Sequence, residues 1–447
     1  MRDRIVKQLD NGLKIAYKRN RSKEAVYLEF RFGSGLNNDP KDKLGLAHFV
    51  EHCAGLTNSK FSQQEKTDYR MKLYYANFST GKTFINFYTY VSDEELEEVF
   101  AHLVNTISDF VVPEDEFENE RKVINQEILR YRKDLAGEMF YTIRETLYSE
   151  ATDIRIRPFG TLNTVSSITK QDILDYAKKC FVLDNCLLTV YGNVSYLKIK
   201  KLIKKYMIPN FENSSGTHFL KPSETIAYSN TKPCIIINPS PDDGKSRIRV
   251  LHKVHLNNIV RMRNHAVALL NSIFETAASE FFRAKYGLCY ASSIKFAKSI
   301  SINNDHDVLE LNVVIDCDQS VVKEVVDKLP EFYNYLQNYS INSESLEKAQ
   351  TILRRYEKCT FSKNFIKSGE SMADSVFNDN IHYTYRQNKK YKKEKEKIQL
   401  EFVIDVFKTI LKTQPFIFIV SNTEDILQGY DTLKKSIDLN SEWIDSL

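Results

Sequence analysis

The first half of the chain alternates short apolar runs with longer amphipathic runs. The short runs are rich in aromatic and β-branched residues, which is typical of β-strands. The longer runs repeat their apolar positions with the period of an α-helix, and one of them begins with Pro113 followed by three acidic residues, a common start of a helix. The predicted strands are residues 13–17, 27–32, 84–91 and 187–191, and the predicted helices are residues 44–56, 94–110 and 113–133.

The second half repeats this alternation after a break. Residues 209–233 are rich in Pro, Gly, Ser, Asn and Thr, and this composition indicates a linker in the first part of the segment. The similar length and element order of the two halves indicate a duplicated α+β unit, so we expect two domains, residues 1–215 and 216–447. The predicted elements of the second domain are strands at 234–238, 247–254, 308–315 and 416–420 and helices at 259–286, 321–336 and 343–357.

The charge of the chain is nearly balanced, with 63 Lys and Arg against 59 Asp and Glu and a formal net charge of +4. Nucleic-acid binders usually carry a strongly basic domain or stripe, so we expect no nucleic-acid partner. The Lys-rich run at 386–397 alternates in sign over most of its length and is interpreted as a solvated helix face. No segment approaches the roughly 20 apolar residues of a membrane span, so no membrane partner is expected either.

Seven cysteines are scattered along the chain, and none belongs to a C-x-x-C pair. This pattern favours neither a disulfide framework nor a cysteine-based zinc site, and it fits a reducing compartment. The first residues of the chain lack the apolar core and cleavage site of a signal peptide. We therefore expect a cytoplasmic protein.

The strongest chemical signal is His-Phe-Val-Glu-His at residues 48–52, inside a predicted helix. Because successive helical residues are rotated by about 100°, His48 and His52 lie one turn apart on one face, with Glu51 beside them. Two neutral imidazoles at this spacing suit the tetrahedral preference of Zn²⁺. Glu51 is placed to act as general base on a zinc-bound water. The opposite side of the helix carries an apolar stripe of Leu46, Phe49, Val50 and Cys53.

A catalytic zinc site needs a third protein ligand and keeps one position open. The predicted helix that starts at Pro113 offers two candidates, Glu120 and Glu127, which lie two turns apart along the edge of its apolar stripe. Carboxylates beside a buried stripe are costly unless they are paired or bound to a metal. Spacing alone leaves both assignments open: one glutamate would be the ligand, and the other would orient a histidine.

The residues around H-x-x-E-H, the signature of inverted zincins, extend the match. The segment GLAHFVEHCAGLT at 45–57 resembles the active-site helix of the pitrilysin family of metallopeptidases. The segment ENERKVINQEI at 118–128 is similar to the helix that carries the third ligand in that family. The resemblance implies that Glu127 completes the zinc site with the two histidines, and that Glu120 is the acid that orients a ligand.

The second half carries a further similarity to the family. The segment FFRAKYGLCYASS at 281–293 resembles its R-x6-Y segment, which places Arg283 and Tyr290 as the matching pair. By that resemblance, the pair binds the substrate backbone and stabilises the tetrahedral oxyanion. A guanidinium and a phenol can both donate hydrogen bonds to charge that develops in a transition state.

A short edge strand is also implied by the resemblance. The family strand that pairs with substrate usually reads Asn-Ala-x-Thr, and this chain has Asn77, Phe78, Ser79 and Thr80. The resemblance assigns these four residues to substrate binding by addition of the peptide to the sheet edge. Phe78 stands where a small residue is common, so the usual side-chain preference of the family is in question here.

The resemblance covers nearly the whole chain. It implies two homologous α+β domains, each a mostly antiparallel sheet packed with helices, which form half of a clam-shell chamber. The expected function is a zinc-dependent endopeptidase acting on short unfolded peptides or peptide precursors, and the second half of the chamber would come from a homodimer or from a heterodimer with a related subunit. The alternative is a non-catalytic scaffold or partner subunit, against which the complete set of ligands and base argues.

Overall fold

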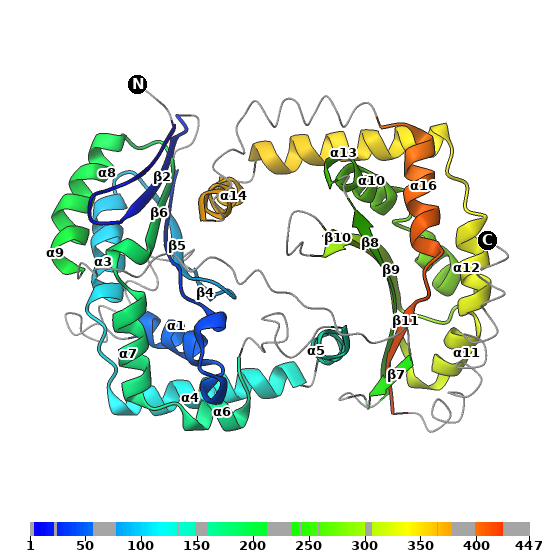
Figure 1. Cartoon of the computed structure of the whole chain (residues 1–447), viewed down its shortest axis with the longest axis horizontal. Helices are drawn as coiled ribbons and strands as arrows, with labels where there is room; N and C mark the ends of the chain where they lie inside the picture. Colours follow the sequence, from blue (N-terminus) through cyan, green and yellow to red (C-terminus); the bar gives the residue numbers. More distant parts are fainter. Residues whose placement is uncertain are drawn as a thin grey trace. The chain divides into compact units, whose positions relative to one another are not determined.

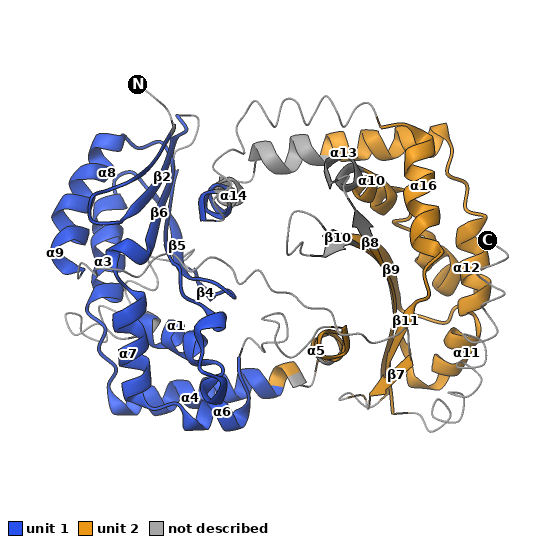
Figure 2. Cartoon of the chain, in the orientation of Figure 1, with its two compact units in different colours: residues 1–129, 156–223, 360–384 blue, residues 130–155, 224–359, 385–447 orange. Residues whose placement is uncertain are grey.

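The computed structural model describes residues 4–21, 25–56, 77–132, 134–147, 159–211, 235–238, 240, 244–257, 260–299, 306–363, 365–377 and 398–422. The chain forms two compact units, which are coloured separately in Figure 2. Unit 1 comprises residues 1–129, 156–223 and 360–384, and unit 2 comprises residues 130–155, 224–359 and 385–447. Each unit is therefore built from three segments, whereas the division expected from the sequence is a single cut at residue 215.

Unit 1 is organised around a six-stranded sheet with the strand order β1-β2-β6-β3-β5-β4. The β2–β6 pair is parallel and every other pair is antiparallel. β3 lies inside the sheet, and all of its residues after the first are buried because both faces of the sheet are covered. The strands are β1 (Arg4–Gln8), β2 (Lys14–Arg19), β3 (Ala25–Phe32), β4 (Asn77–Thr80), β5 (Ile85–Ser92) and β6 (Cys186–Gly192).

One face of this sheet supports the main core of unit 1. Alternate residues of β3, such as Leu28 and Phe30, point into this core together with the apolar sides of several helices. Figure 1 shows α3, α7 and α8 on this side of the sheet. The helices of unit 1 are α1 (Leu46–Leu56), α3 (Leu96–Ser108), α4 (Glu114–Arg132), α6 (Leu162–Ser167), α7 (Lys170–Cys180), α8 (Tyr196–Leu202), α9 (Ile208–Asn210) and α14 (Phe365–Phe377).

The opposite face of the sheet is covered by α14, which packs Val376 against Tyr27 and its neighbours. Two buried charged residues of β3 point to the same side. The Arg31 Nε donates to Glu29 Oε1 at 2.7 Å, and its Nη1 donates to Asp374 Oδ1 of α14 at 2.7 Å. Charge pairing therefore joins α14 to the sheet in addition to apolar packing.

Unit 2 repeats this strand order. Its five strands lie in the order β7-β11-β8-β10-β9, with β7 and β11 parallel and the other pairs antiparallel. Counted from β2 in unit 1 and from β7 in unit 2, both sheets have the order 1-5-2-4-3. The expected fold class, two α+β domains with mostly antiparallel sheets, is confirmed. The strands are β7 (Ile235–Asn238), β8 (Lys245–Asn257), β9 (Ala291–Ser299), β10 (His306–Asp318) and β11 (Phe416–Val420).

Two helices that the sequence predicts as continuous are interrupted in unit 2. The helix expected at 259–286 divides into α10 and a π-helical segment (Ser279–Lys285), and Phe274 between them packs in the core against Phe407. The helix expected at 321–336 breaks before α12, where Pro330 cannot supply a backbone N–H. The helices of unit 2 are α5 (Leu135–Leu147), α10 (Val260–Ile273), α11 (Val322–Asp327), α12 (Leu329–Gln337), α13 (Ser343–Lys363) and α16 (Leu400–Leu411).

The second face of the unit 2 sheet is covered by α5, which packs Met139 and Ile143 against Leu251 and Phe418. α5 follows α4 in the sequence but belongs to unit 2, and α14 follows α13 but belongs to unit 1. The two helices are thus exchanged between the units, which explains why each unit consists of three segments.

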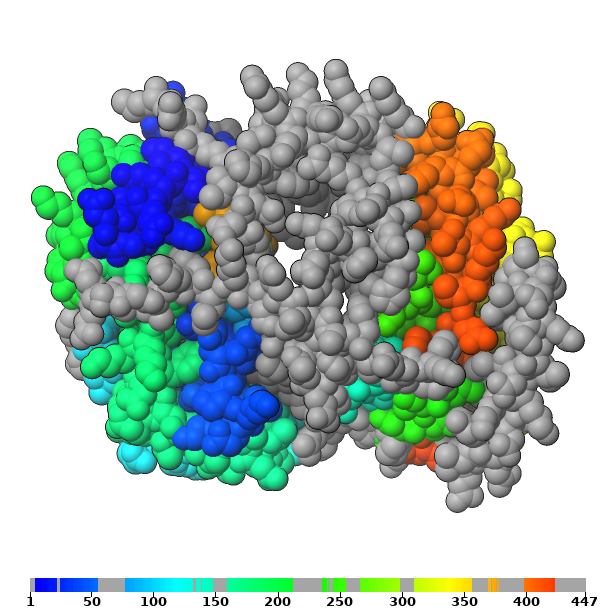
Figure 3. All heavy atoms as spheres, viewed as in Figure 1, coloured from blue at the N-terminus to red at the C-terminus, as the bar shows by residue number. Residues whose placement is uncertain are grey.

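Helix α16 shows how the amphipathic pattern is realised. Val403, Phe407 and Ile410 are buried in the core of unit 2, and the opposite side of the helix is exposed at the molecular surface (orange in Figure 3). Across the described ranges of the chain, no helix combines the length and the apolar character needed to cross a membrane.

Candidate metal centre

The start of α1 is fixed by a side chain outside the helix. Asp39 Oδ2 accepts the Gly45 N–H at 2.8 Å, and Oδ1 accepts the Ala47 N–H at 2.8 Å. Gly45 has φ +97°, and a Cβ there would lie 2.7 Å from the Phe159 carbonyl oxygen, so a larger residue would be strained. This anchoring sets where the residues that follow project from the helix.

The apolar stripe predicted for α1 is confirmed, because Leu46, Phe49, Val50 and Cys53 are all buried in the core of unit 1. The same helix carries His48, Glu51 and His52 away from that core. The helix is therefore held by one side and presents three polar side chains on the other, as its sequence pattern predicts.

Three ligand-type side chains converge at this place. The Nε2 atoms of His48 and His52 are 3.2 Å apart, and Glu127 Oε2 of α4 is 3.7 Å from each of them. One ligand atom from each residue lies within 4.8 Å of the others. Donors at ~2.0–2.1 Å from one tetrahedral ion are separated by about 3.3 Å, so these three atoms have the spacing that a Zn²⁺ site requires.

Glu120 occupies a different position from Glu127. Its Oε2 lies 2.9 Å from Nδ1 of His52, on the far side of the imidazole from the Nε2 atom that faces the other donors. A proton on Nδ1 donated to Glu120 leaves the Nε2 lone pair free to bind a metal. The geometry thus separates two glutamates that spacing alone could not distinguish.

The electrostatics of the two histidines differ. Burial, together with the charge of His52, lowers the pKa of His48 to about 3, so this ring is neutral. Burial also opposes protonation of His52, but the hydrogen bond that His52 donates to Glu120 and the charges of Glu51 and Glu127 outweigh it and raise the pKa of His52. A cluster with this much negative charge around one imidazole favours a cation at its centre.

Glu51 lies beside the three donors. Burial raises its pKa, although the charge of His52 and a hydrogen bond from Thr80 oppose this shift. The hydrogen bond runs from Thr80 Oγ1 to Glu51 Oε2 at 3.2 Å. The carboxylate is therefore a partly buried acid–base group next to a potential metal site, which is the arrangement expected for a general base.

The relative position of α1 and α4 is set by aromatic packing. The ring of Phe49 on α1 stacks on Phe117 of α4, with centroids 5.1 Å apart and an angle of 9° between the planes. Such stacked pairs contribute about 0.5–1.5 kcal/mol beyond their buried area. The contact lies on the apolar sides of the two helices whose polar sides carry the histidines and Glu127.

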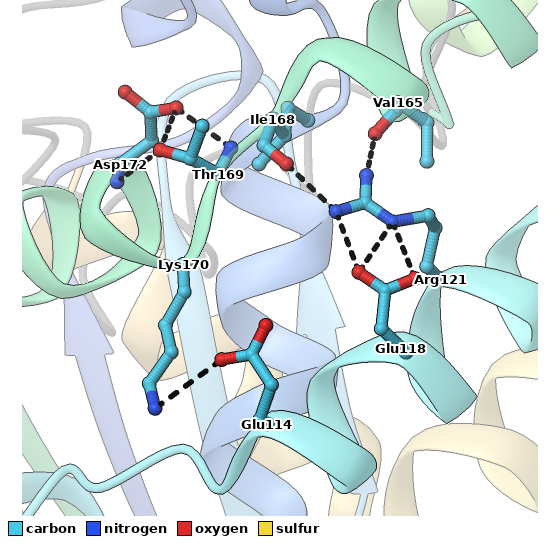
Figure 4. Close-up of polar contacts among 8 residues, drawn as sticks. All are labelled: Glu114, Glu118, Arg121, Val165, Ile168, Thr169, Lys170 and Asp172. Carbon is cyan, nitrogen blue, oxygen red and sulfur yellow. Dashed lines mark hydrogen bonds and ion pairs between the residues drawn. The ribbon is translucent and has the colours of Figure 1, made fainter.

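α4 is further anchored by Arg121, as Figure 4 shows. The guanidinium donates to the backbone carbonyls of Val165 and Ile168, the latter at 2.9 Å, and it pairs with Glu118 at 3.2 Å. It also lies over the ring of Phe117, 4.6 Å from the centroid. Arg121 therefore ties α4 to the end of α6 and to the aromatic contact with α1.

The edge strand β4 lies next to α1. It pairs with β5 in the register Asn77–Tyr88 to Thr80–Ile85, and no described strand pairs with its other edge. The ring of Phe78 packs edge-on against Phe87, with centroids 4.8 Å apart. The bulk of Phe78 is thus directed toward the core, which accounts for a large residue at this position.

Arg283 and Tyr290 belong to unit 2, whereas the His-His-Glu cluster belongs to unit 1. Arg283 lies in the π-helical segment, and its Nη1 donates to the Tyr290 carbonyl oxygen at 3.4 Å. Tyr290 is about half exposed. Their part in one reaction with the cluster stays a prediction.

Three residues of the site region were not identified from the sequence. Asp39 stabilises α1 from a turn that precedes it by several residues, outside the spacing of an ordinary N-cap. Arg121 acts through backbone carbonyls of distant residues, which leave no local pattern. Asn86, on β5, accepts a hydrogen bond from Ser79 of the edge strand and donates to the buried Glu29 at 2.8 Å.

Comparison with known proteins places these features in a family. A family model described as insulinase (peptidase family M16) matches residues 14–155, and one described as the peptidase M16 inactive domain matches residues 167–353. A protein named "Uncharacterized zinc protease" from Rickettsia felis is 24% identical over 339 residues, which cover 74% of this chain and 76% of that protein. The beta subunit of the mitochondrial-processing peptidase of Bos taurus is 26% identical over 212 residues, 47% of this chain and 42% of the subunit.

Among solved structures, the first half of the periplasmic protease PqqL from Escherichia coli has a TM-score of 0.72 at 16% identity, and the match covers 98% of this chain and 97% of that half. The same match covers 50% of the longer PqqL chain. At this identity the likeness shows the fold alone. The two family models together match most of the sequence, so the resemblance to pitrilysin-type metallopeptidases is confirmed and the chain belongs to peptidase family M16.

Proposed function

We propose that this chain is a zinc-dependent endopeptidase that hydrolyses short unfolded peptides or peptide precursors. The observation that carries the proposal is the convergence of His48, His52 and Glu127 beside the partly buried carboxylate of Glu51. The names of the relatives, a zinc protease and a processing peptidase, support a peptidase role and zinc as the metal.

The Nε2 atoms of His48 and His52 and Oε2 of Glu127 would hold the ion. Bound Zn²⁺ would supply a lowered pKa for a coordinated water and a positive charge for the carbonyl oxygen of the substrate. Glu120 keeps His52 in the required tautomer through Nδ1. The donor set of two imidazoles and one carboxylate is one that catalytic zinc uses in proteins.

Glu51 would move the proton. Its carboxylate would accept a proton from the attacking water and then deliver it to the nitrogen of the leaving amine. Burial, which raises its pKa, brings the group closer to the pH at which it must both accept and release a proton.

Peptide would bind as an added strand along the free edge of β4. Strand addition uses backbone hydrogen bonds, so it tolerates many sequences and requires an extended, unfolded substrate. Asn77, Phe78, Ser79 and Thr80 form this edge, and Asn77 Nδ2 donates to the Tyr88 hydroxyl at 3.3 Å. The strand lies in unit 1, the unit that carries the metal ligands.

Arg283 and Tyr290 of unit 2 would donate hydrogen bonds to the substrate backbone and to the oxyanion that develops on its carbonyl. The hydrogen bond from Arg283 to the Tyr290 carbonyl holds the two residues together. This role rests on the resemblance of their segment to the R-x6-Y segment of the family.

A second half would complete the enclosed chamber. The match to PqqL covers almost all of this chain but half of that longer protein, which supports a second, similar half supplied by another copy or by a related subunit. A homodimer and a heterodimer both satisfy this requirement. Placement in the cytoplasm also stays a prediction.

The competing function is a non-catalytic partner subunit. The family model that matches residues 167–353 is described as an inactive domain, and the metal cluster lies in the other matched region. The presence of all three ligands and of the base in one unit favours the catalytic function over this alternative.

The test combines metal content with cleavage of a quenched fluorescent peptide library by wild type and Glu51→Gln. We expect about one zinc per chain in both proteins and cleavage by wild type alone. Glu51→Gln keeps the size of the side chain but removes the basic carboxylate, so retained turnover would contradict the assigned base. Zinc without cleavage in wild type would favour the partner-subunit alternative.

A further inference from the structure

The side chains of β4 divide between the two faces of the sheet, as they must in a strand. Ser79 donates to the side chain of Asn86 on one face. Phe78 and Thr80 point to the other face, where Phe78 packs against Phe87 and Thr80 meets α1. The edge strand therefore presents its backbone to a peptide, while Thr80 is directed toward the catalytic helix.

The Thr80 hydroxyl makes a defined contact there. Its Oγ1 donates to Oε2 of Glu51 at 3.2 Å, and Glu51 is partly buried at this point. A free glutamate side chain has several rotatable bonds, and fixing them costs conformational entropy. A hydrogen bond to one carboxylate oxygen restricts that freedom and leaves Oε1 to receive a proton.

Threonine is well suited to this task. Its branched side chain is stiff at χ1, so an oxygen on it is held in one direction more firmly than an oxygen on a longer chain. The strand that carries it is the one along which the peptide is proposed to bind. The base and the scissile carbonyl would thus be positioned from one rigid element, which is what productive orientation requires.

We propose that Thr80 is a positioning residue, which orients the Glu51 carboxylate for proton transfer and does not form part of the peptide-binding surface. This inference rests on the proposed function, and it changes the role that resemblance gives to Thr80. The hydroxyl contributes to turnover through Glu51, while binding of the peptide depends on the backbone edge of β4.

The first experiment compares Thr80→Val and Thr80→Ser in the full chain, using a library peptide that wild type cleaves. Valine keeps the branched shape and removes the donor, so kcat should fall about tenfold while KM stays within about twofold. Serine keeps the donor and should restore most of kcat. Zinc content and the melting temperature should match wild type in both variants. Thr89→Val, the same change at a buried site of β5, is the control and should leave kcat unchanged.

The second experiment measures peptide affinity without turnover. In a Glu51→Gln background, Thr80→Val should leave the dissociation constant of the same peptide within about twofold, because the backbone edge is intact. Neither Glu51→Gln nor the double variant should cleave the peptide, because Thr80 acts only through the carboxylate.

Three results would overturn the inference: unchanged kcat in Thr80→Val, a loss of kcat that Thr80→Ser does not restore, or weaker peptide binding in the Glu51→Gln background. The last would return Thr80 to the binding surface. Failure of the proposed function is read separately, from wild type and Glu51→Gln. Absent cleavage by wild type would remove that function, and retained turnover in Glu51→Gln would remove the assigned base; either result removes this inference.

Discussion

Units 1 and 2 share one strand order but differ at one helix, which lies between β3 and β4 in unit 1 and between β8 and β9 in unit 2. In unit 1 this helix is α1, which presents His48, Glu51 and His52. In unit 2 it is α10, whose sequence contains one histidine and no acidic residue, and which buries Leu269 and Leu270 in the core. Over the residues that the structure describes, the His48–His52–Glu127 group is the single cluster of three potential metal ligands. The shared topology provides a position for a site, and a few polar residues on one helix provide its chemistry.

The exchanged helices, in contrast, are a feature that the two units share. Each unit uses a helix of this kind to cover the second face of its sheet. α5 covers the second face of one sheet with Met139 and Ile143, and α14 covers the second face of the other with Met372 and Val376. In each case a helix that follows the long helix of one unit packs in the other unit. The duplication thus preserves the scaffold in both units, while the chemistry differs between them.

The largest predicted effect is a loss of zinc affinity on substitution of Glu127, the proposed third ligand in unit 1. Glu127→Ala removes one of three donors, so zinc affinity should fall about 1,000-fold or more. Glu120→Gln leaves the donors in place and alters only the orientation of His52, so a loss of about 10–100-fold is expected. Competition with a chromophoric chelator measures both. Glu114→Gln, a change at an exposed position of the same helix, is the control and should have no effect. Equal losses in the two test variants would contradict the separate roles of the glutamates.

A smaller but still large effect is expected from the charge pairs on the two sheets. Arg31 and Glu29 in unit 1 are 3% and 0% exposed, whereas Arg247 and Asp316 in unit 2 are 20% and 14% exposed. Arg31→Met leaves a buried carboxylate without its cation, so unit 1 should lose about 3–5 kcal/mol of stability. Arg247→Met leaves a carboxylate that water can reach, and about 1 kcal/mol is expected. Urea unfolding of both variants measures the difference in unfolding free energy. Similar losses would show that burial does not determine how much each ion pair contributes to stability.

Acid should weaken unit 2 through His252. Its Nδ1 donates to the Thr413 carbonyl at 2.7 Å, and its Nε2 accepts from the Tyr333 hydroxyl at 2.9 Å, which is a complete set of bonds for a neutral ring. Burial lowers the pKa of His252 to about 4, below its ordinary value of 6.5. The folded state therefore binds the proton more weakly than the unfolded state. The contribution is fully present above pH 6.5 and is lost as the pH falls toward 4, on the order of 2 kcal/mol between pH 7 and 5.

His102 gives the matching case in unit 1, because burial also lowers its pKa to about 4. His252→Gln should flatten the pH dependence of hydrogen exchange in β8 and β10 but leave β3 and β5 unchanged. His102→Gln should do the reverse. If either variant flattened the pH dependence of hydrogen exchange in both units, or in neither, these two histidines would not control the acid sensitivity of their own units.

The sequence predicted the central strands and the shared helical face of the two histidines, because both depend on local patterns. The run at 27–32 is rich in aromatic residues and is followed by Gly33, and it forms most of β3. His48, Glu51 and His52 share a helical face by spacing alone. Glu127 needed the family resemblance, since Glu120 has the same local pattern, and only the contact with His52 Nδ1 separates them in space.

Other features depend on contacts between distant residues, and the sequence could not reveal them. α5 and α14 are ordinary amphipathic helices, and nothing in their own sequences says which sheet they cover. The helix expected at 259–286 is interrupted after Ile273, where Phe274 packs against Phe407 in the core, and that tertiary contact leaves no mark on the local periodicity. Thr80 has the right spacing for a strand, but its contact with Glu51 requires that α1 lies beside β4.

The smallest predicted effect is the loss of stability when Asp39, which caps the start of α1, is replaced. Asp39→Ala removes the acceptors of the Gly45 and Ala47 N–H groups, so unit 1 should lose about 1–2 kcal/mol of stability. Asp39→Asn keeps one acceptor oxygen and should lose about half as much. If Asp39 also sets the direction in which the histidines project, zinc affinity should fall in the same order, measured by the chelator competition used for Glu127. Loss of stability with unchanged zinc affinity would mean that the aromatic contact between Phe49 and Phe117 alone positions the ligands, because that contact remains when the cap is removed.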